Sequence, residues 1–255
     1  MRLLLSGLLD NLLAPAPDPR RVRFLRQQPY AHRGLHGSGV PENSSAAFVA
    51  AMAAGHGIEC DVQLSADGKA MVFHDYDLDR MTLEDGPVIA RHSAELDSIA
   101  LSGSKEKIPR LRTMLQSVAD RVPVLIEIKS RDANIRPICI AVRRVLEGTP
   151  GNYAIMSFNP LVSAWFRRHA PHVVRGLVVT EEQDHGLRGR INRHRNLWIA
   201  KPDFLAYDIR DLPSKFASAQ RARGLPVLTW TVRNAEQEAT ATEFADEVIY
   251  ERAAY

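Results

Sequence analysis

The chain has 255 residues, of which 45% are hydrophobic and 25% charged, a composition typical of a soluble globular protein with one or two domains. The net charge of +3 suits an anionic substrate or surface, but the basic residues form no clustered stripe of the kind that nucleic-acid binding requires, so we expect no nucleic-acid partner. Two cysteines, Cys60 and Cys139, exclude a disulfide framework, and we interpret them as buried apolar side chains of a cytoplasmic protein.

Residues 1–29 predict a leader helix and a connection to the main domain. Leucines dominate its first half, but Asp10 and Asn11 interrupt them after about eight residues, which is too short a run to span a membrane. No clear cleavage site follows. We therefore expect a short amphipathic helix that docks on the body, with weak membrane-surface contact as a further role and no transmembrane segment.

From Tyr30 onward, short apolar runs predict strands that end in polar residues. The first strand covers residues 30–33 and the second residues 57–62, with a helix over 45–54 between them that Asn43 or Ser44 can cap. Asp67-Gly68 predicts a hairpin that joins the second strand to residues 70–73. Residues 75–110 show no long period and predict an insertion with one short helix near 93–99.

A regular alternation of strands and helices follows the insertion. Strands are predicted over 122–129, 153–158, 173–179, 204–208, 226–232 and 248–250, and helices over 111–119, 135–146, 160–169, 183–197, 213–223 and 235–245. Such alternation favours a parallel sheet. The eight units predict an α/β fold of the (β/α)₈ TIM-barrel class, residues 30–255, with a small insertion after the second strand. A doubly wound open sheet is the alternative.

Polar residues gather where the predicted strands end, which is where barrel enzymes place catalytic groups. Glu59 and Asp61 lie two apart on the second strand and so share one face. Without a cation between them, they would repel each other and one would stay protonated. Glu127 and Lys129 repeat this spacing on a later strand, and His32, Arg33, His74, Ser157, Thr180, Asp208 and Trp230 occupy further strand ends.

Three of these residues predict a metal site. Glu59, Asp61 and Glu127 offer only oxygen ligands, which select a hard divalent cation such as Mg²⁺ or Ca²⁺. His32 and His74 could instead be ligands, which would indicate Zn²⁺. We prefer them as an acid–base pair, because an imidazole can hold either role near neutral pH.

Two cations complete the predicted site. Arg33 and Lys129 supply fixed positive charge for a phosphate group. A metal beside them would polarise a phosphoryl oxygen and stabilise the charge that develops in the transition state. Asp75, Asp77 and Asp79 have the spacing of a calcium loop but lack its glycine and terminal glutamate, so we interpret them as a solvated turn.

The motifs together resemble a known family. The run HRG…PENS..AF..A, followed by ECDVQLSADG and VFHD..LDRMT, is similar to the signature of the glycerophosphodiester phosphodiesterase family, a group of phospholipase C-like barrels. The similarity continues through IPRL, IEIK, SF and TWTV and covers residues 30–250. It departs in TWTVRN, where the family more often has asparagine directly after TWTV. It also departs in DEVIYERAAY, where an Ile-Thr pair, an aspartate and a proline are usual.

The resemblance implies a barrel with a small insertion and a divalent cation held by Glu59, Asp61 and Glu127, with Glu42 nearby. It further implies the acid–base pair His32 and His74, phosphate contacts from Arg33 and Lys129, and Trp230 near the glycerol moiety. The implied activity is metal-dependent hydrolysis of glycerophosphodiesters to sn-glycerol 3-phosphate and an alcohol, part of lipid and glycerol metabolism. Two alternatives stay open: a phospholipid phosphodiesterase of the sphingomyelinase D or lysophospholipase D type, and a non-catalytic binder of phosphodiesters or anionic lipid.

Overall fold

The structure is a computed structural model that describes residues 2–182 and 186–251. Residues 2–6 are described only as part of a helix. The first three residues of the helix predicted over 183–197 and the last four residues of the predicted barrel domain lie outside the described residues. The chain divides into two compact units, the first formed by residues 2–29, 130–133 and 154–250, and the second by residues 30–129, 134–153 and 251.

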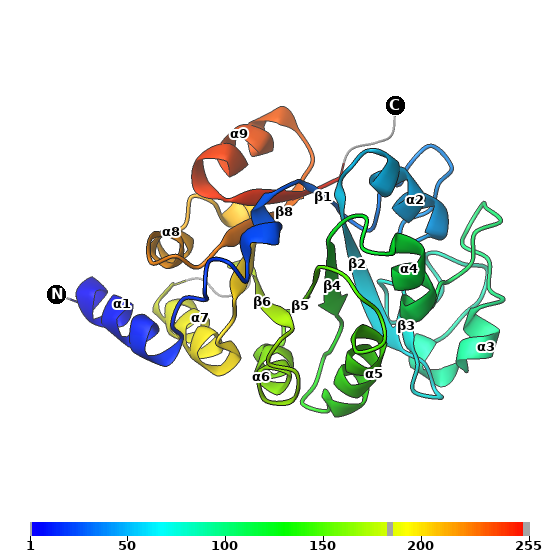
Figure 1. The fold of residues 1–255 in the computed structure, drawn as a ribbon, viewed down its shortest axis with the longest axis horizontal. Helices are drawn as coiled ribbons and strands as arrows, with labels where there is room; N and C mark the ends of the chain where they lie inside the picture. Colours follow the sequence, from blue (N-terminus) through cyan, green and yellow to red (C-terminus); the bar gives the residue numbers. More distant parts are fainter. Residues whose placement is uncertain (1, 183–185, 252–255) are drawn as a thin grey trace. The chain divides into compact units, whose positions relative to one another are not determined.

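The second unit is built on a short parallel sheet with one antiparallel neighbour (Figure 1). Its strands are β1 (Tyr30–Ala31), β2 (Gly57–Leu64), β3 (Ala70–Val72) and β4 (Val124–Ile128), and its α-helices are α2 (Ser45–Ala53), α3 (Ser93–Leu96), α4 (Leu111–Val118) and α5 (Arg136–Leu146). Strand β2 pairs in parallel with β1 and β4. Its antiparallel pairing with β3 confirms the hairpin that Asp67-Gly68 predicts.

The insertion after β2 has a small core of its own. Seven buried apolar side chains form it: Met71, Phe73, Leu78, Val88, Leu96, Leu101 and Ile108. Asp67 in the hairpin accepts hydrogen bonds from the backbone N–H and the hydroxyl of Ser93, at 2.8 Å each. The first turn of α3 is therefore tied to the β2–β3 hairpin.

The first unit continues the strand and helix alternation in strict chain order. Its strands are β5 (Tyr153–Ser157), β6 (Val174–Val179), β7 (Phe204–Asp208), β8 (Val227–Val232) and β9 (Glu247–Tyr250), and its helices are α1 (Arg2–Leu13), α6 (Pro160–His169), α7 (Gly186–Ala200), α8 (Lys215–Ala222) and α9 (Ala235–Phe244). Each strand from β5 to β9 pairs in parallel with the next. Within the described residues, short 3₁₀ helices cover Arg23–Arg26 and Ile209–Asp211 in this unit and Val88–Ala90 in the second unit.

The eight parallel strands, β1, β2 and β4–β9, make the fold a (β/α)₈ barrel, and β3 is the additional strand of the insertion. Within each unit the neighbouring parallel strands follow one another along the chain. A doubly wound sheet would reverse this order at a switch point, so that alternative is wrong. The strands are buried on both faces, as expected of a parallel sheet covered by helices.

Local chemistry explains where the predicted boundaries shift. Ser44 accepts a hydrogen bond from the Ala47 N–H and so caps α2 as predicted. Helix α8 begins at Lys215 instead of residue 213, because the Ser214 hydroxyl accepts from the N–H groups of Phe216 and Ala217. The leader forms the predicted helix α1, which contacts α7. None of the described helices is long and apolar enough to cross a membrane.

Candidate active site

Three carboxylates lie together on adjacent strands of the second unit. Glu59 and Asp61 come from β2 and Glu127 from β4, and the parallel register places Asp61 opposite Glu127. One oxygen atom from each residue lies within 4.8 Å of one oxygen atom from each of the other two, and all three side chains are buried. The shared face of Glu59 and Asp61 follows from the period of two along a strand, and β4 brings the third carboxylate beside it.

The electrostatics of the three carboxylates fit a divalent cation. Burial raises the pKa of Glu59 well above its usual value, and the neighbouring Asp61 and Glu127 raise it further. Burial also raises the pKa of Asp61, but Lys129 and then Arg33 outweigh this and leave it lowered. A hard cation would neutralise such a set of buried oxygen ligands, so these residues could hold one.

Two cations border the carboxylates and are paired with them. The Lys129 ammonium lies 2.9 Å from Asp61 and 2.6 Å from Glu127. The Arg33 guanidinium lies 3.2 Å from Asp61 and donates to Glu42 at 2.8 Å. Burial lowers the pKa of Arg33 and of Lys129, but the neighbouring carboxylates outweigh this effect and leave both values raised. Both groups therefore stay charged at neutral pH.

His32 lies in the loop just after β1, because this strand ends at Ala31. Its Nδ1 lies 3.1 Å from a carboxylate oxygen of Glu251, the residue that follows the last strand. His36 from the same loop joins these two residues, with ligand atoms within 4.8 Å, and burial lowers the pKa of His36. Glu251 can thus orient the His32 ring and leave its Nε2 for a substrate.

His74 follows β3 and has the same kind of support. Its Nδ1 lies 2.5 Å from a carboxylate oxygen of Asp75. The Gln63 amide on β2 donates to the backbone carbonyls of His74 and Asp75 at 2.9 Å each, which holds this turn against the strand. Burial lowers the pKa of His74, and Lys129 and Arg33 lower it further against the opposing effect of Asp61 and Asp75.

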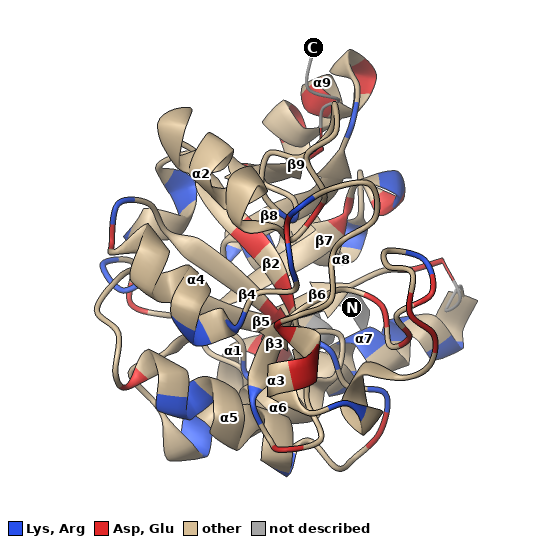
Figure 2. Ribbon diagram, turned by 90° about the vertical axis from the view of Figure 1, so that its right-hand side faces the viewer, with Lys and Arg blue, Asp and Glu red and all other residues tan. Residues whose placement is uncertain are grey.

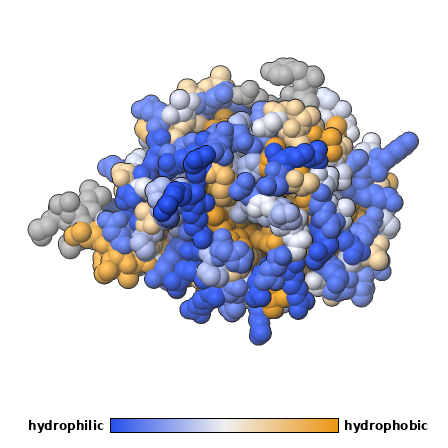
Figure 3. All heavy atoms as spheres, viewed as in Figure 1, coloured by the Kyte–Doolittle hydropathy of each residue, from blue (hydrophilic) through white to orange (hydrophobic). Residues whose placement is uncertain are grey.

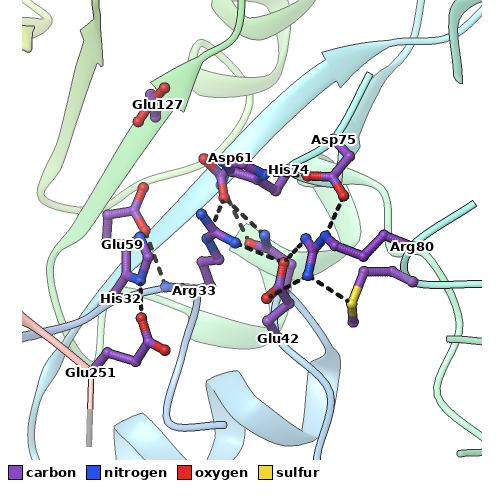
Figure 4. A network of polar contacts seen from close by, with 12 residues as sticks. His32, Arg33, Glu42, Glu59, Asp61, His74, Asp75, Arg80, Glu127 and Glu251 are labelled. Atoms are coloured by element: carbon purple, nitrogen blue, oxygen red, sulfur yellow. Dashed lines mark hydrogen bonds and ion pairs between the residues drawn. The ribbon is translucent and has the colours of Figure 1, made fainter. Parts of the chain in front are cut away.

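Glu42 anchors a second layer of ion pairs and does not join the carboxylate group. Figure 4 shows it between Arg33 and Arg80. The Arg80 guanidinium lies 2.6 Å from Glu42 and also pairs with Asp75. The network therefore connects the loop after β1, which carries Arg33, to the turn that carries His74 and Asp75.

The backbone of the first loop requires special residues to bring these groups together. Gly34 has φ of +79°, and a Cβ at this position would lie 2.8 Å from the Cβ of Ala47. Asn43 has φ of +55°, and its amide donates to Asp61 at 3.0 Å. Glycine and asparagine are the residues that tolerate such conformations best, so the loop fixes Arg33 and Asp61 through its backbone as well as its side chains.

Trp230 and the other late strand-end residues belong to the first unit. The Trp230 indole N–H donates to the Ala206 carbonyl at 2.9 Å, and its ring packs edge-on against Phe158 at 5.6 Å. Asp208 binds Arg210 and caps a 3₁₀ helix. The contact of Trp230 with glycerol stays a prediction, whereas Asp208 has a structural role within its own unit.

Several residues of the site were not predicted from the sequence. Glu251 and Asp75 each contact a histidine, and Asn43, Gln63 and Arg80 support the carboxylates and the turns around them. The sequence did contain a signal for Glu251, because this residue follows the last predicted strand at the position where the family usually has an aspartate. Asp75 also had a signal, because it directly follows His74 in the sequence.

Comparison with known proteins identifies the family. The model of the glycerophosphoryl diester phosphodiesterase family matches residues 32–251, a segment that begins at His32 and ends at its partner Glu251. The chain belongs to this family. A relative named glycerophosphodiester phosphodiesterase, from Caldanaerobacter subterraneus subsp. tengcongensis, is 43% identical over 158 residues, which are 58% of this chain and 65% of that relative.

Solved structures of the family share the fold over most of their length. A phosphodiesterase from Oleispira antarctica, solved in complex with the product sn-glycerol-3-phosphate, has 25% identity and a TM-score of 0.74 over 89% of this chain and 93% of its own. The glycerophosphodiester phosphodiesterase of Thermotoga maritima has 26% identity and a TM-score of 0.70 over 87% of this chain and 92% of its own. These likenesses confirm the barrel and the family that the sequence motifs predict.

Proposed function

We propose that this protein is a divalent-cation-dependent glycerophosphodiester phosphodiesterase that releases sn-glycerol 3-phosphate and an alcohol. The observation that carries the proposal is the buried group Glu59, Asp61 and Glu127, with His32 and His74 each supported by a carboxylate. Family membership and the product bound to the Oleispira antarctica relative support the substrate class. The head group is an alcohol joined to the phosphate by the bond that hydrolysis breaks.

The three carboxylates would hold Mg²⁺ or Ca²⁺, since their ligand atoms are all oxygens. Such an ion polarises a phosphoryl oxygen and stabilises the negative charge that develops on it. Arg33 and Lys129 would bind the remaining phosphate oxygens, and Trp230 would line the pocket near the glycerol. The two cations are already charged and held in place by Asp61, so they need no rearrangement to meet an anion.

His32 and His74 would act as the acid–base pair. One accepts the proton of the attacking water or substrate hydroxyl, and the other donates a proton to the oxygen of the departing alcohol as the P–O bond breaks. Glu251 and Asp75 bind the Nδ1 atoms, so each ring is oriented with Nε2 available.

The test is release of sn-glycerol 3-phosphate from deacylated glycerophosphodiesters, with Mg²⁺, with Ca²⁺ and with chelator. We expect metal-dependent turnover that falls by about 100-fold or more in His32→Ala and in His74→Ala, while both variants keep the wild-type unfolding temperature. No release with either metal from any head group would reject the proposal. Cleavage of intact phospholipid but not of its deacylated form would favour the phospholipid phosphodiesterase instead.

A substrate with an activated leaving group assigns the two histidines. A p-nitrophenolate leaves without protonation, so replacement of the general acid should slow a p-nitrophenyl diester much less than a natural diester. Replacement of the general base should slow both substrates equally. Equal losses on both substrates in both variants would show that neither histidine protonates the leaving group.

A further inference from the structure

Helix α1 lies on the first unit with its one acidic side chain facing inward. Asp10 is 1% exposed and accepts hydrogen bonds from the indole of Trp198 and the amide of Gln220, at 2.8 Å each. It also lies 2.9 Å from Nδ1 of His194. These contacts attach α1 to α7 and α8 through a polar residue.

Leu8, Leu9 and Leu12 of α1 are exposed, which is opposite to the usual arrangement of an amphipathic helix. Leu8 and Leu12 lie one turn apart and are 67% and 76% exposed. On α7, Leu187 and Ile191 form a second row of exposed apolar side chains, again one turn apart. Figure 3 shows the apolar surface of α1 at the left, next to hydrophilic side chains.

The two helices also line an apolar groove. Its volume is about 200 Å³, and it is lined by Leu9, Leu187, Arg190, Ile191, His194 and Trp198. Contiguous exposed apolar surface with polar side chains at its rim is typical of an interaction site. We refer to the exposed residues of α1 and α7, together with this groove, as the α1–α7 face.

The charged side chains exposed on α7 are all basic. Arg188, Arg190 and Arg195 on α7 are exposed, and Figure 2 shows the basic segments of this helix in blue. Helix α7 contains no acidic residue. The one acidic residue of α1 is the buried Asp10. Neither helix therefore exposes a carboxylate within its described residues that would oppose an anionic partner.

A polar cavity continues the face on its inner side. It has a volume of about 370 Å³ and shares Arg190 and His194 with the apolar groove. Its lining combines further cations, Lys215 and Arg223, with the carboxylates of Asp10, Glu181 and Asp211. The apolar groove and the exposed arginines of α7 beside it match the acyl and phosphate parts of an anionic lipid.

We propose that the α1–α7 face docks the protein on an anionic lipid surface. The exposed leucines and Ile191 would enter the boundary between head groups and acyl chains, and the arginines would bind lipid phosphates. A second copy of the chain fits less well, because a two-fold interface would bring the same arginines together. No residue of the α1–α7 face belongs to the proposed catalytic set.

The experiment is co-sedimentation of the full chain with vesicles of phosphatidylcholine, alone or with about 30% phosphatidylglycerol. We expect binding only to the anionic vesicles, and its loss when salt is raised from ~0.1 M to ~0.5 M. The double variant Leu12→Ser with Ile191→Ser should bind about 10-fold or more weakly. The double variant Arg188→Glu with Arg195→Glu should bind about 100-fold more weakly.

Two matched controls distinguish docking through the α1–α7 face from nonspecific adsorption to vesicles. Leu83→Ser removes an apolar side chain that is 98% exposed in the second unit, and Arg112→Glu reverses an exposed charge on α4. Both should bind like wild type, and all variants should keep the wild-type unfolding temperature. The readout is bound protein, so it stands whether or not the proposed hydrolysis is observed.

Three results would overturn the proposal. The first is no binding of wild type to anionic vesicles at low salt. The second is binding that the α1–α7 variants retain at the wild-type level. The third is a concentration-dependent dimer that Leu12→Ser with Ile191→Ser dissociates while vesicles bind nothing, which would assign the face to a second copy of the chain.

Discussion

Buried beside two other carboxylates, Glu59 has a pKa raised well above its usual value, first by burial and then by Asp61 and Glu127. A carboxyl whose pKa rises on folding destabilises the folded protein at neutral pH, because the unfolded chain ionises it freely. In the presence of chelator, the free energy of unfolding of Glu59→Gln should therefore be about 1–3 kcal/mol higher than that of wild type. The variant should also no longer be stabilised by divalent cations. Urea unfolding with chelator and with Mg²⁺ measures both effects.

Glu127→Gln is the matched variant, and its effect on the free energy of unfolding should have the opposite sign. Glu127 lies 2.6 Å from the Lys129 ammonium, so its neutral replacement leaves a buried cation with fewer partners. With chelator present, we expect its free energy of unfolding to be about 1–3 kcal/mol lower than that of wild type. Equal changes in the two variants would contradict the charge distribution described for the site.

Glu251 offers a second test at the scale of one residue. Its contact with His32 Nδ1 makes it a positioning residue, and Glu251→Gln should lower kcat by about 10- to 100-fold while KM changes little. The loss should be larger for Glu251→Ala, which cannot accept a hydrogen bond. Glu236→Gln on α9 is the control, and a wild-type kcat in Glu251→Ala would show that His32 needs no such support.

At the scale of elements, the attachment of α1 depends on one carboxylate. Burial raises the pKa of Asp10, but hydrogen bonds from His194, Gln220 and Trp198 outweigh it and leave the pKa lowered. The stabilisation is complete above the unfolded pKa of about 4 and is lost as the pH falls through the lower folded value. Asp10→Asn should cost about 2–3 kcal/mol near pH 7.

The pH dependence checks that prediction. The difference in free energy of unfolding between wild type and Asp10→Asn should shrink as the pH falls from about 5 to about 3. Cleavage within α1 by a nonspecific protease should rise over the same range in wild type. A difference that stays constant down to pH 3 would show that the ionised Asp10 does not hold the helix.

At the scale of the molecule, all the proposed metal ligands lie in the second unit. Mg²⁺ or Ca²⁺ at about 100 times its Kd should stabilise the protein by about 2.7 kcal/mol, which raises Tm by about 5–10 °C for a chain of this size. Chelator should reverse the shift. Hydrogen exchange should slow first in β2 and β4, and equal slowing in β6 and β7 would argue against a site confined to the second unit.

The alternation of strands and helices could be predicted from the sequence because it rests on local periodicity and caps. The hairpin, the insertion and the boundary residue Ser44 follow from the same local chemistry. The start of α8 at Lys215 differed from prediction, since Ser214 and Pro213 both carry helix-start signals and only the folded chain shows which of them acts.

The candidate site, too, could be predicted from the sequence only in part. The sequence determined which residue types could hold a cation, because Glu59 and Asp61 share a face whenever their segment is a strand, and it determined the family through the motifs from His32 to TWTV. Only the tertiary structure decided that Glu251 supports His32 and that Arg33 and Lys129 are paired with carboxylates. It also decided that Asp10 is buried while Leu8 and Leu12 on the same helix are exposed. Period and capping act between near neighbours, whereas these contacts join segments as many as 219 residues apart, and packing alone selects them.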